Sequence, residues 1–126
     1  MEGGKRALRK LIALPDRPTA VLCSNDMTAI GVMREAYDQG ISVPQELSVV
    51  GFDNIRLSEF MIPPLTTIDM SQTELARIAF KALVSDIGRE IPAEHGIEYA
   101  LSTNLVLRRS TALAEAIQSR AKALKR

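Results

Sequence analysis

The segment that decides the fold is AVLCSNDMTAIG, residues 20–31. It continues an apolar run, TAVLCS at residues 19–24, which is typical of a short strand buried on both faces of a sheet. The run ends at two strongly polar residues, Asn25 and Asp26, and a helical pattern of apolar residues begins at once. A strand that turns directly into a helix is the first half of an α/β unit, so the polar pair lies at its corner.

The helix is predicted over Asp26–Gln39, and its end is clearly marked. Gly40 suits the left-handed position after a helix, Ile41 can fold back onto the last turn, and Pro44 prevents continuation. The face expected to be buried consists of Ala29, Ile30, Met33, Ala36 and Tyr37.

A second strand is predicted in ELSVVGFDN, residues 46–54, and it ends in a second polar corner at Asp53 and Asn54. Strand, helix and strand joined by connections of a few residues form a right-handed unit whose strands are parallel. The predicted fold class is therefore α/β, with a parallel sheet.

Further elements are predicted on both sides of this unit. Apolar residues at helical spacing indicate a helix over Lys5–Leu14, and LTTI at residues 65–68 indicates a short strand. Ser71 and Glu74 have the spacing of a capping box and open another helix, which ends near Gly88. The predicted buried face of that helix is Leu75, Ile78, Ala79, Ala82, Leu83 and Ile87.

The last third of the chain is predicted in less detail. Residues 96–101 and 104–110 are apolar runs that indicate two strands, whose pairing the pattern leaves open. From Thr111 a helical stripe indicates a terminal helix. The only basic cluster lies there and is interpreted as a solvated helix end: Arg120, Lys122, Lys125 and Arg126.

Composition narrows the class of protein. The chain has 126 residues, 46% of them apolar, which suffices for one core. Its 16 basic and 15 acidic residues provide no overall field that would attract nucleic acid or anionic lipid. The single cysteine, Cys23, excludes an internal disulfide and is interpreted as a small core residue in a reducing compartment.

Nothing in the chain indicates a membrane protein or a secreted one. No apolar run approaches the ~20 residues that a transmembrane helix needs. Residues 1–10, MEGGKRALRK, lack the apolar stretch of a signal peptide. A cytoplasmic location is therefore expected.

The two polar corners form the candidate site. In an open parallel sheet, ligands bind outside the carboxyl ends of the strands, where Asn25, Asp26, Asp53 and Asn54 are placed. Carboxylates accept from two hydroxyls and amides both donate and accept, which suits a polyhydroxylated ligand such as a sugar or a nucleoside. The alternative for the first corner is that Asn25 or Asp26 only caps the following helix. Asp53 precedes no clean helix pattern, which favours a ligand role.

Residue patterns for catalysis are missing from the sequence. The lone histidine, His95, lies in the polar segment PAEHGIE and is interpreted as an exposed loop residue. Ser24 beside Asp26 makes no triad, because no histidine is placed to activate it. No metal-ligand spacing, phosphate-binding loop or GxSxG motif occurs, so we expect no enzyme and no cofactor.

Four blocks occur in a specific order along the chain: PTAVLCSNDMTAIGVM (18–33), GISVPQELSVVGFDN (40–54), PPLTTI (63–68) and LVLRRST (105–111). Through them, the chain from about Glu2 to Thr111 resembles the effector-binding core of the LacI/GalR family of bacterial transcriptional regulators. One block alone would be weak, but all four in this order are highly specific.

This resemblance implies a periplasmic-binding-protein-like I fold, which is flavodoxin-like with helices on both faces of a parallel sheet. In the family, a small-molecule effector, commonly a sugar or a nucleobase-like metabolite, binds between two lobes of a homodimer. Its binding changes the orientation of the lobes and so the affinity of an N-terminal helix-turn-helix for operator DNA.

The resemblance also assigns roles by position. Asn25 and Asp53 match effector contacts, Asp26 matches the helix cap, and Gln72 matches a position that can line the pocket from the other lobe. Met70 departs from the polar residue that the family often has there. The family's dimer face corresponds to Met27, Ile30, Arg34, Phe60 and Met61.

By the same resemblance, residues 1–110 form a truncated core with a helical tail at 111–126. Residues 1–62 and 97–110 belong to the second lobe, and 66–90 supply a strand and helix of the first lobe. The helix-turn-helix is expected to be missing, so operator DNA would be bound only through that absent part. The apolar stripe of the 66–90 helix would then be exposed, which predicts a dimer, rearranged packing or poor solubility. The rival interpretations are a sugar-binding or transport component of the same fold and a flavodoxin-like enzyme.

Overall fold

The structure is a computed structural model, and it describes residues 1–87 and 98–113. The predictions for His95, for a helix end near Gly88 and for the terminal basic cluster lie outside the described residues, as does most of the predicted tail helix. The elements are α1 (Glu2–Ile12), β1 (Ala20–Leu22), α2 (Asp26–Asp38), β2 (Ser48–Val50), the 3₁₀ helix η1 (Arg56–Phe60), β3 (Thr67–Asp69), α3 (Gln72–Ile87) and β4 (Asn104–Val106).

The predicted unit of two parallel strands joined by a helix is present. β1 pairs with β2 in parallel, with Ala20 opposite Ser48 and Leu22 opposite Val50. Thr66 continues the parallel order through a bridge to Val50. Beyond it, β3 pairs with β4 in antiparallel fashion. The α/β class is therefore confirmed, and the open pairing of the 104–110 strand is resolved by its contact with β3.

The first strand is buried on one face only, so the expectation of two buried faces was wrong. Val21 and Cys23 point toward the core, whereas the Leu22 side chain is 72% exposed. Side chains alternate across a strand, and α2 packs on the face that Cys23 shares. Among the described residues, nothing covers the other face at Leu22.

The core lies between α1, α2 and the parallel strands. Its buried members are Leu8, Cys23, Ala29, Val32, Met33, Ala36, Leu47, Val49 and Leu65. The core role predicted for Cys23 is thus confirmed, but Tyr37 of the predicted buried face is exposed. The helix ends as predicted, because Gly40 adopts φ 70° and the Ile41 N–H donates to the Ala36 carbonyl at 2.8 Å.

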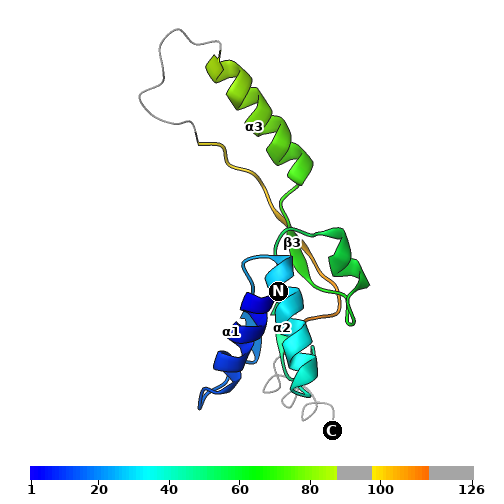
Figure 1. Cartoon of the computed structure of the whole chain (residues 1–126). Helices are drawn as coiled ribbons and strands as arrows, with labels where there is room; N and C mark the ends of the chain where they lie inside the picture. Colours follow the sequence, from blue (N-terminus) through cyan, green and yellow to red (C-terminus); the bar gives the residue numbers. More distant parts are fainter. Residues whose placement is uncertain (88–97, 114–126) are drawn as a thin grey trace.

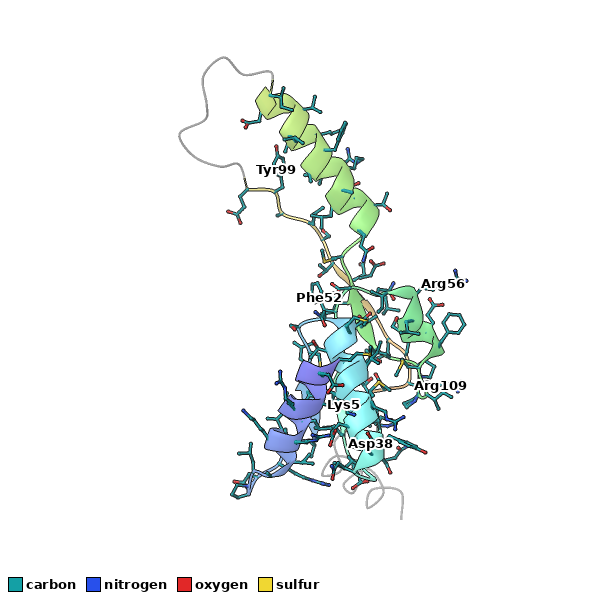
Figure 2. All side chains as sticks on the ribbon, viewed as in Figure 1. Lys5, Asp38, Phe52, Arg56, Tyr99 and Arg109 are labelled. Atoms are coloured by element: carbon teal, nitrogen blue, oxygen red, sulfur yellow. The ribbon has the colours of Figure 1, made fainter. Side chains whose placement is uncertain are left out.

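Helices α1 and α2 lie side by side and approach closely (Figure 1). A Cβ atom on Gly4 would collide with the backbone carbonyl of Thr28, so only glycine permits this separation. Lys5 and Asp38, labelled in Figure 2, add an ion pair of 3.6 Å between the helices.

The buried Glu35 carboxylate fastens α2 to α1. Arg9 binds it with two parallel bonds, Nε to Oε1 at 2.8 Å and Nη2 to Oε2 at 2.9 Å. Gln39 Nε2 donates a third bond to Oε1 at 2.8 Å. A bidentate guanidinium satisfies the charge of Glu35 in a site where its side chain has no solvent contact.

The region of β3, residues 98–101 and the start of α3 differs most from the predictions. The strand expected at 65–68 lies at Thr67–Asp69, and residues 98–101 form no strand; residues 96 and 97 lie outside the described part. Half of the predicted capping box exists, because Ser71 Oγ accepts from the Glu74 N–H at 3.4 Å. The carboxylate of Glu74 instead pairs with Arg77.

Helix α3 projects from the body, and none of its residues is buried (Figures 1 and 2). Its predicted apolar stripe exists, but Leu75, Leu83 and Ile87 are exposed. The burial predicted from periodicity alone was therefore wrong, whereas the exposure implied by the family resemblance is what the structure has.

The Glu35 carboxylate should make the free energy of unfolding depend on pH. Hydrogen bonds from Arg9 and then Gln39 lower the pKa of Glu35 from 4.5 to about 2. The unfolded chain then binds more protons, so the stabilising contribution is full above pH 4.5 and is lost as pH falls toward 2. Urea unfolding should show a steeper loss of stability in this range for the wild type than for Glu35→Gln. Equal pH slopes would contradict this assignment.

Candidate functional site

The two polar corners predicted from the sequence lie next to each other. The Cys23 N–H donates to the Val50 carbonyl at 2.8 Å, and the Asp26 N–H donates to the Phe52 carbonyl at 2.7 Å. These bonds join the chain just after β1 to the chain just after β2. Asn25 and Asp53 therefore stand at the carboxyl ends of neighbouring parallel strands, the position at which α/β sheets bind ligands. We call this region the strand-end corner.

Asn25 is the residue that caps α2. Its Oδ1 accepts the Thr28 N–H at 2.8 Å, and its backbone is extended, with φ −159° and ψ 166°. The prediction that Asp26 provides the cap was wrong, because Asp26 is already the first helical residue and its side chain points inward. The cap uses only the Asn25 oxygen. Among the described residues, no acceptor binds its amide nitrogen.

Asp26 lies inside the protein and has no exposed surface. Its Oδ1 accepts from the Thr67 hydroxyl at 2.5 Å, and its Oδ2 accepts from the Ile55 N–H at 2.9 Å. Gly51 faces this carboxylate, and a Cβ there would collide with Oδ1. Both oxygens are thus used within the fold, so the structure gives Asp26 an internal role instead of the ligand contact proposed from the sequence.

The charge of Asp26 also affects its neighbour Cys23. Burial, followed by the negative charge of Asp26, raises the pKa of the Cys23 thiol to about 11. The protonated thiol is a weak nucleophile, which agrees with a packing role for this cysteine.

The second corner has an unusual backbone. Asp53 and Asn54 both have positive φ angles, 109° and 51°. The Asp53 N–H donates to the Ile68 carbonyl at 2.9 Å, and the Asn54 N–H donates to Thr67 Oγ1 at 3.3 Å. The Asp53 side chain is half-buried, and its carboxylate accepts no hydrogen bond from the described residues. Asp53 is thus the half-buried acid of the strand-end corner, whereas Asp26 is fully buried.

The side chain of Arg108 holds the second corner in place through hydrogen bonds. Arg108 was not among the residues predicted from the sequence to be functional. Its guanidinium donates to Asn54 Oδ1 at 2.8 Å, to Ser58 Oγ at 2.9 Å and to the Leu65 carbonyl at 2.9 Å. The side-chain oxygen of Asn54 is therefore used within the fold. The signal for Arg108 was present in the block LVLRRST, but a sequence pattern cannot reveal which of two adjacent arginines turns inward.

Among the described residues, no hydrogen bond links the Gln72 side chain to the strand-end corner. Gln72 is the first residue of α3, beyond β3, and its side chain is exposed. Met70 is half-buried in the connection just before it. The role of Gln72 as a pocket residue stays a prediction.

An apolar surface lies on α2 and the segment after η1. A cavity of about 500 Å³ there is lined by Met1, Ile30, Met33, Arg34, Tyr37, Phe60, Met61 and Ile62. Four of the five residues predicted at a dimer face are in this set; the fifth, Met27, is exposed on the first turn of α2. We call this set the α2 apolar surface. Ile30 is nearly buried, whereas Phe60 and Ile62 are largely exposed.

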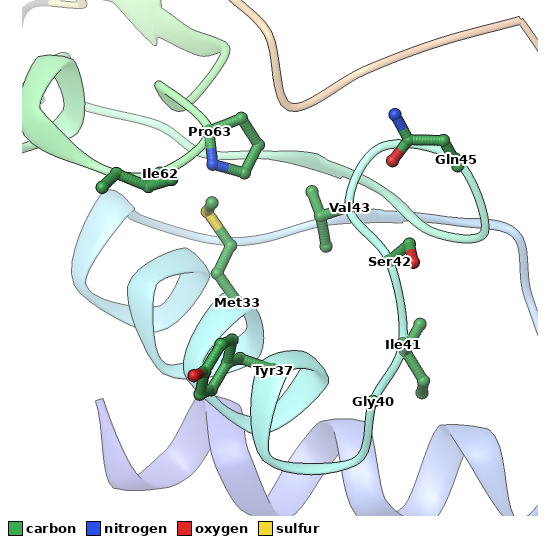
Figure 3. Close-up of a pocket in the computed structure, with 9 residues that line it drawn as sticks. All are labelled: Met33, Tyr37, Gly40, Ile41, Ser42, Val43, Gln45, Ile62 and Pro63. Atoms are coloured by element: carbon green, nitrogen blue, oxygen red, sulfur yellow. The ribbon is translucent and has the colours of Figure 1, made fainter.

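A second cavity of about 460 Å³ adjoins the α2 apolar surface (Figure 3). In this view Met33, Val43 and Ile62 face a common space, and Tyr37 borders it from the last turns of α2. Neither Asn25 nor Asp53 lines either cavity. The cavities therefore belong to the α2 side of the molecule and not to the strand-end corner.

The described part of the chain contains neither a metal-binding cluster nor a membrane-spanning helix. Among residues 1–87 and 98–113, no group of three or more histidine, cysteine, aspartate or glutamate side chains is arranged to hold a metal ion. None of the helices described there combines the length and apolar character needed to cross a bilayer.

Comparisons with known proteins give consistent matches. The family model described as a periplasmic binding protein-like domain matches residues 1–111. The HTH-type transcriptional repressor CytR of Escherichia coli is 44% identical over 86 residues, which cover 68% of this chain and 25% of that protein. The HTH-type transcriptional repressor PurR of Mannheimia succiniciproducens is 39% identical over 109 residues, covering 86% of this chain and 32% of that protein.

A solved structure extends these matches. A LacI family transcriptional regulator from Enterococcus faecium, crystallised with bound ribose, is 32% identical and superposes with a TM-score of 0.73. The superposition covers 88% of this chain and 40% of that one. The chain thus spans about a quarter to a third of the curated relatives it matches.

Replacing Arg108 should loosen the second corner and destabilise the protein. Arg108→Ala leaves the acceptors at Asn54, Ser58 and Leu65 without their charged donor, which should reduce the free energy of unfolding by about 2–3 kcal/mol. Arg109→Ala is the matched control, because that side chain is exposed and, within the described ranges, its only bond is from its backbone N–H to Pro64. Urea denaturation measures both. Equal destabilisation by the two variants would contradict the role of Arg108.

Proposed function

The chain belongs to the LacI/GalR family of transcriptional regulators, within their periplasmic binding protein-like domain, and from this premise we propose that it is the ligand-sensing part of such a regulator. Its ligand is a small polyhydroxylated metabolite of the sugar class. The observation that carries the proposal is the strand-end corner, where Asn25 and Asp53 stand on adjoining strand ends.

The chemistry of that corner suits hydroxyl groups. The Asp53 carboxylate accepts no hydrogen bond from the described part of the protein, so it is available to accept from two sugar hydroxyls. The side-chain oxygen of Asn25 accepts the capping hydrogen bond from Thr28, and its NH₂ group remains a donor. One acceptor and one donor on a rigid sheet edge match a ring that carries both kinds of group. The ribose in the Enterococcus faecium regulator supports this ligand class.

We further propose that the whole regulator acts as a cytoplasmic homodimer. The α2 apolar surface supports this, because Phe60 is 67% and Ile62 is 95% exposed beside a cavity that a second copy can fill. In this proposal, residues 1–62 and 97–110 form one lobe and 66–90 contribute to the other, with Gln72 facing the ligand from there. Operator DNA is bound by a helix-turn-helix elsewhere in the regulator.

The ligand proposal predicts specific losses of binding. In a titration of the chain with D-ribose followed by NMR, the Asn25 side-chain amide and the Asp53 backbone amide should shift. Asp53→Asn removes the charge from the acceptor and should raise the dissociation constant roughly tenfold. Asp16→Asn, at an exposed aspartate outside the corner, is the control and should bind as the wild type does. If ribose changes the chemical shifts of other residues but not those of Asn25 and Asp53, the proposed location is wrong. Normal ribose binding by Asp53→Asn would also disprove it.

The dimer proposal is tested by the solution mass. Light scattering should give a dimer for the wild type and a monomer for Phe60→Glu, because a buried charge at the α2 apolar surface opposes association. Phe80→Glu is the matched control, since Phe80 on α3 is 68% exposed against 67% for Phe60. If only Phe80→Glu abolishes the dimer, the α3 stripe drives association and the proposed interface is wrong.

A further inference from the structure

The loop that carries Asp53 needs an external restraint to keep its shape. Two consecutive residues other than glycine, Asp53 and Asn54, have φ angles of 109° and 51°. Side chains with a Cβ rarely adopt such angles, and they persist where surrounding contacts determine the backbone. The contacts that hold this loop therefore also determine where the Asp53 carboxylate points.

Three successive backbone N–H groups of the loop are hydrogen-bonded, the first two to β3 and the third to the first residue of α2. Asp53 donates to the Ile68 carbonyl at 2.9 Å, Asn54 to the Thr67 hydroxyl oxygen at 3.3 Å, and Ile55 to Asp26 Oδ2 at 2.9 Å. Only the first of these bonds is between backbone groups. The other two depend on the side chains of Thr67 and Asp26.

The Thr67 hydroxyl serves two partners at once, and its orientation is set by Asp26. It donates its only proton to Asp26 Oδ1 at 2.5 Å, so its oxygen lone pairs face the loop and accept from Asn54. Both Asp26 and Thr67 are fully buried, which strengthens these bonds relative to bonds in water.

Thr67 is also the first residue of β3, the strand that joins the body to α3 (Figure 1). We propose that Asp26 and Thr67 are positioning residues for ligand binding: they hold the Asp53 loop in its left-handed conformation and tie it to β3. A shift of β3 relative to β2 thereby moves Asp53, and a ligand on Asp53 restrains β3. The inference rests on the proposed function only for the identity of Asp53 as the ligand contact.

Hydrogen exchange measured by NMR on the full chain tests the positioning role without a ligand. Thr67→Val keeps the shape of the side chain and removes its hydroxyl, so protection of the Asn54 and Ile55 amides should fall roughly tenfold. Thr66→Val is the matched control, because Thr66 is equally buried and its hydroxyl oxygen accepts from the Arg108 N–H instead. Amides of α2 should keep their protection, which separates a local effect from global unfolding. Thr67→Ser restores the hydroxyl and should restore protection.

Loss of protection that is equal in Thr67→Val and Thr66→Val would overturn the inference, as would failure of Thr67→Ser to restore it. If Thr67→Val does not fold, the test uses Thr67→Ser and the wild type. In both proteins the Asn54 and Ile55 amides must then exchange at least tenfold more slowly than in an unfolded chain. A D-ribose titration adds the functional arm: Thr67→Val should weaken binding more than Thr66→Val does. If the wild type binds no ribose, the proposed function fails for this sugar while the exchange data still decide the positioning role. Normal ribose binding by an unprotected Thr67→Val loop would disprove the coupling to the ligand.

Discussion

The buried carboxylate of Asp26 is the constraint on which the rest of the strand-end corner depends. An ionisable group without solvent contact is costly unless its oxygens are bonded, and here the Thr67 hydroxyl and the Ile55 N–H bind them. These two partners come from different segments, so satisfying one side chain fixes the end of β1, the loop after β2 and the start of β3 together. The space for the carboxylate exists because position 51 is glycine. The arrangement that presents Asp53 to solvent follows from this packing.

A second polar group has the same function at the other end of α2. Glu35 is buried like Asp26, but its partner is the guanidinium of Arg9 on α1, with Gln39 completing the set. The close approach of the two helices at Gly4 brings these side chains within reach. The helix is thus attached at its first turn to the sheet and near its last turn to α1. Such a rigid α2 supports both the cap at Asn25 and the α2 apolar surface.

The exposed apolar residues form two groups on different elements of the structure. On α2 and the segment after η1 they surround a cavity and include residues that family resemblance places at a dimer face, which is the surface of the dimer proposal. On α3 they form one stripe of a helix with no buried residue, joined to the body through β3. The matches cover only 25% of CytR and 32% of PurR, so most of each of these curated relatives has no counterpart in this chain. The two exposed apolar surfaces therefore lie on different elements, one on α2 and the segment after η1 and the other on α3.

The sequence by itself determined the local structure: a helix from Asp26 that ends before Gly40, two parallel strands, polar corners at both strand ends and the family of the protein. The local elements depend on periodicity, capping and turn residues, which are neighbours along the chain. The family came instead from the resemblance of four ordered sequence blocks to the LacI/GalR regulators. Only the tertiary structure decided which polar residue caps α2 and which is buried as an internal hydrogen-bond acceptor. Asn25 caps and Asp26 is buried, although either suits a cap by its chemistry, because the choice depends on Thr67, more than 40 positions away. The inward turn of Arg108 and the exposure of α3 likewise depend on distant segments, and a linear pattern does not contain that information.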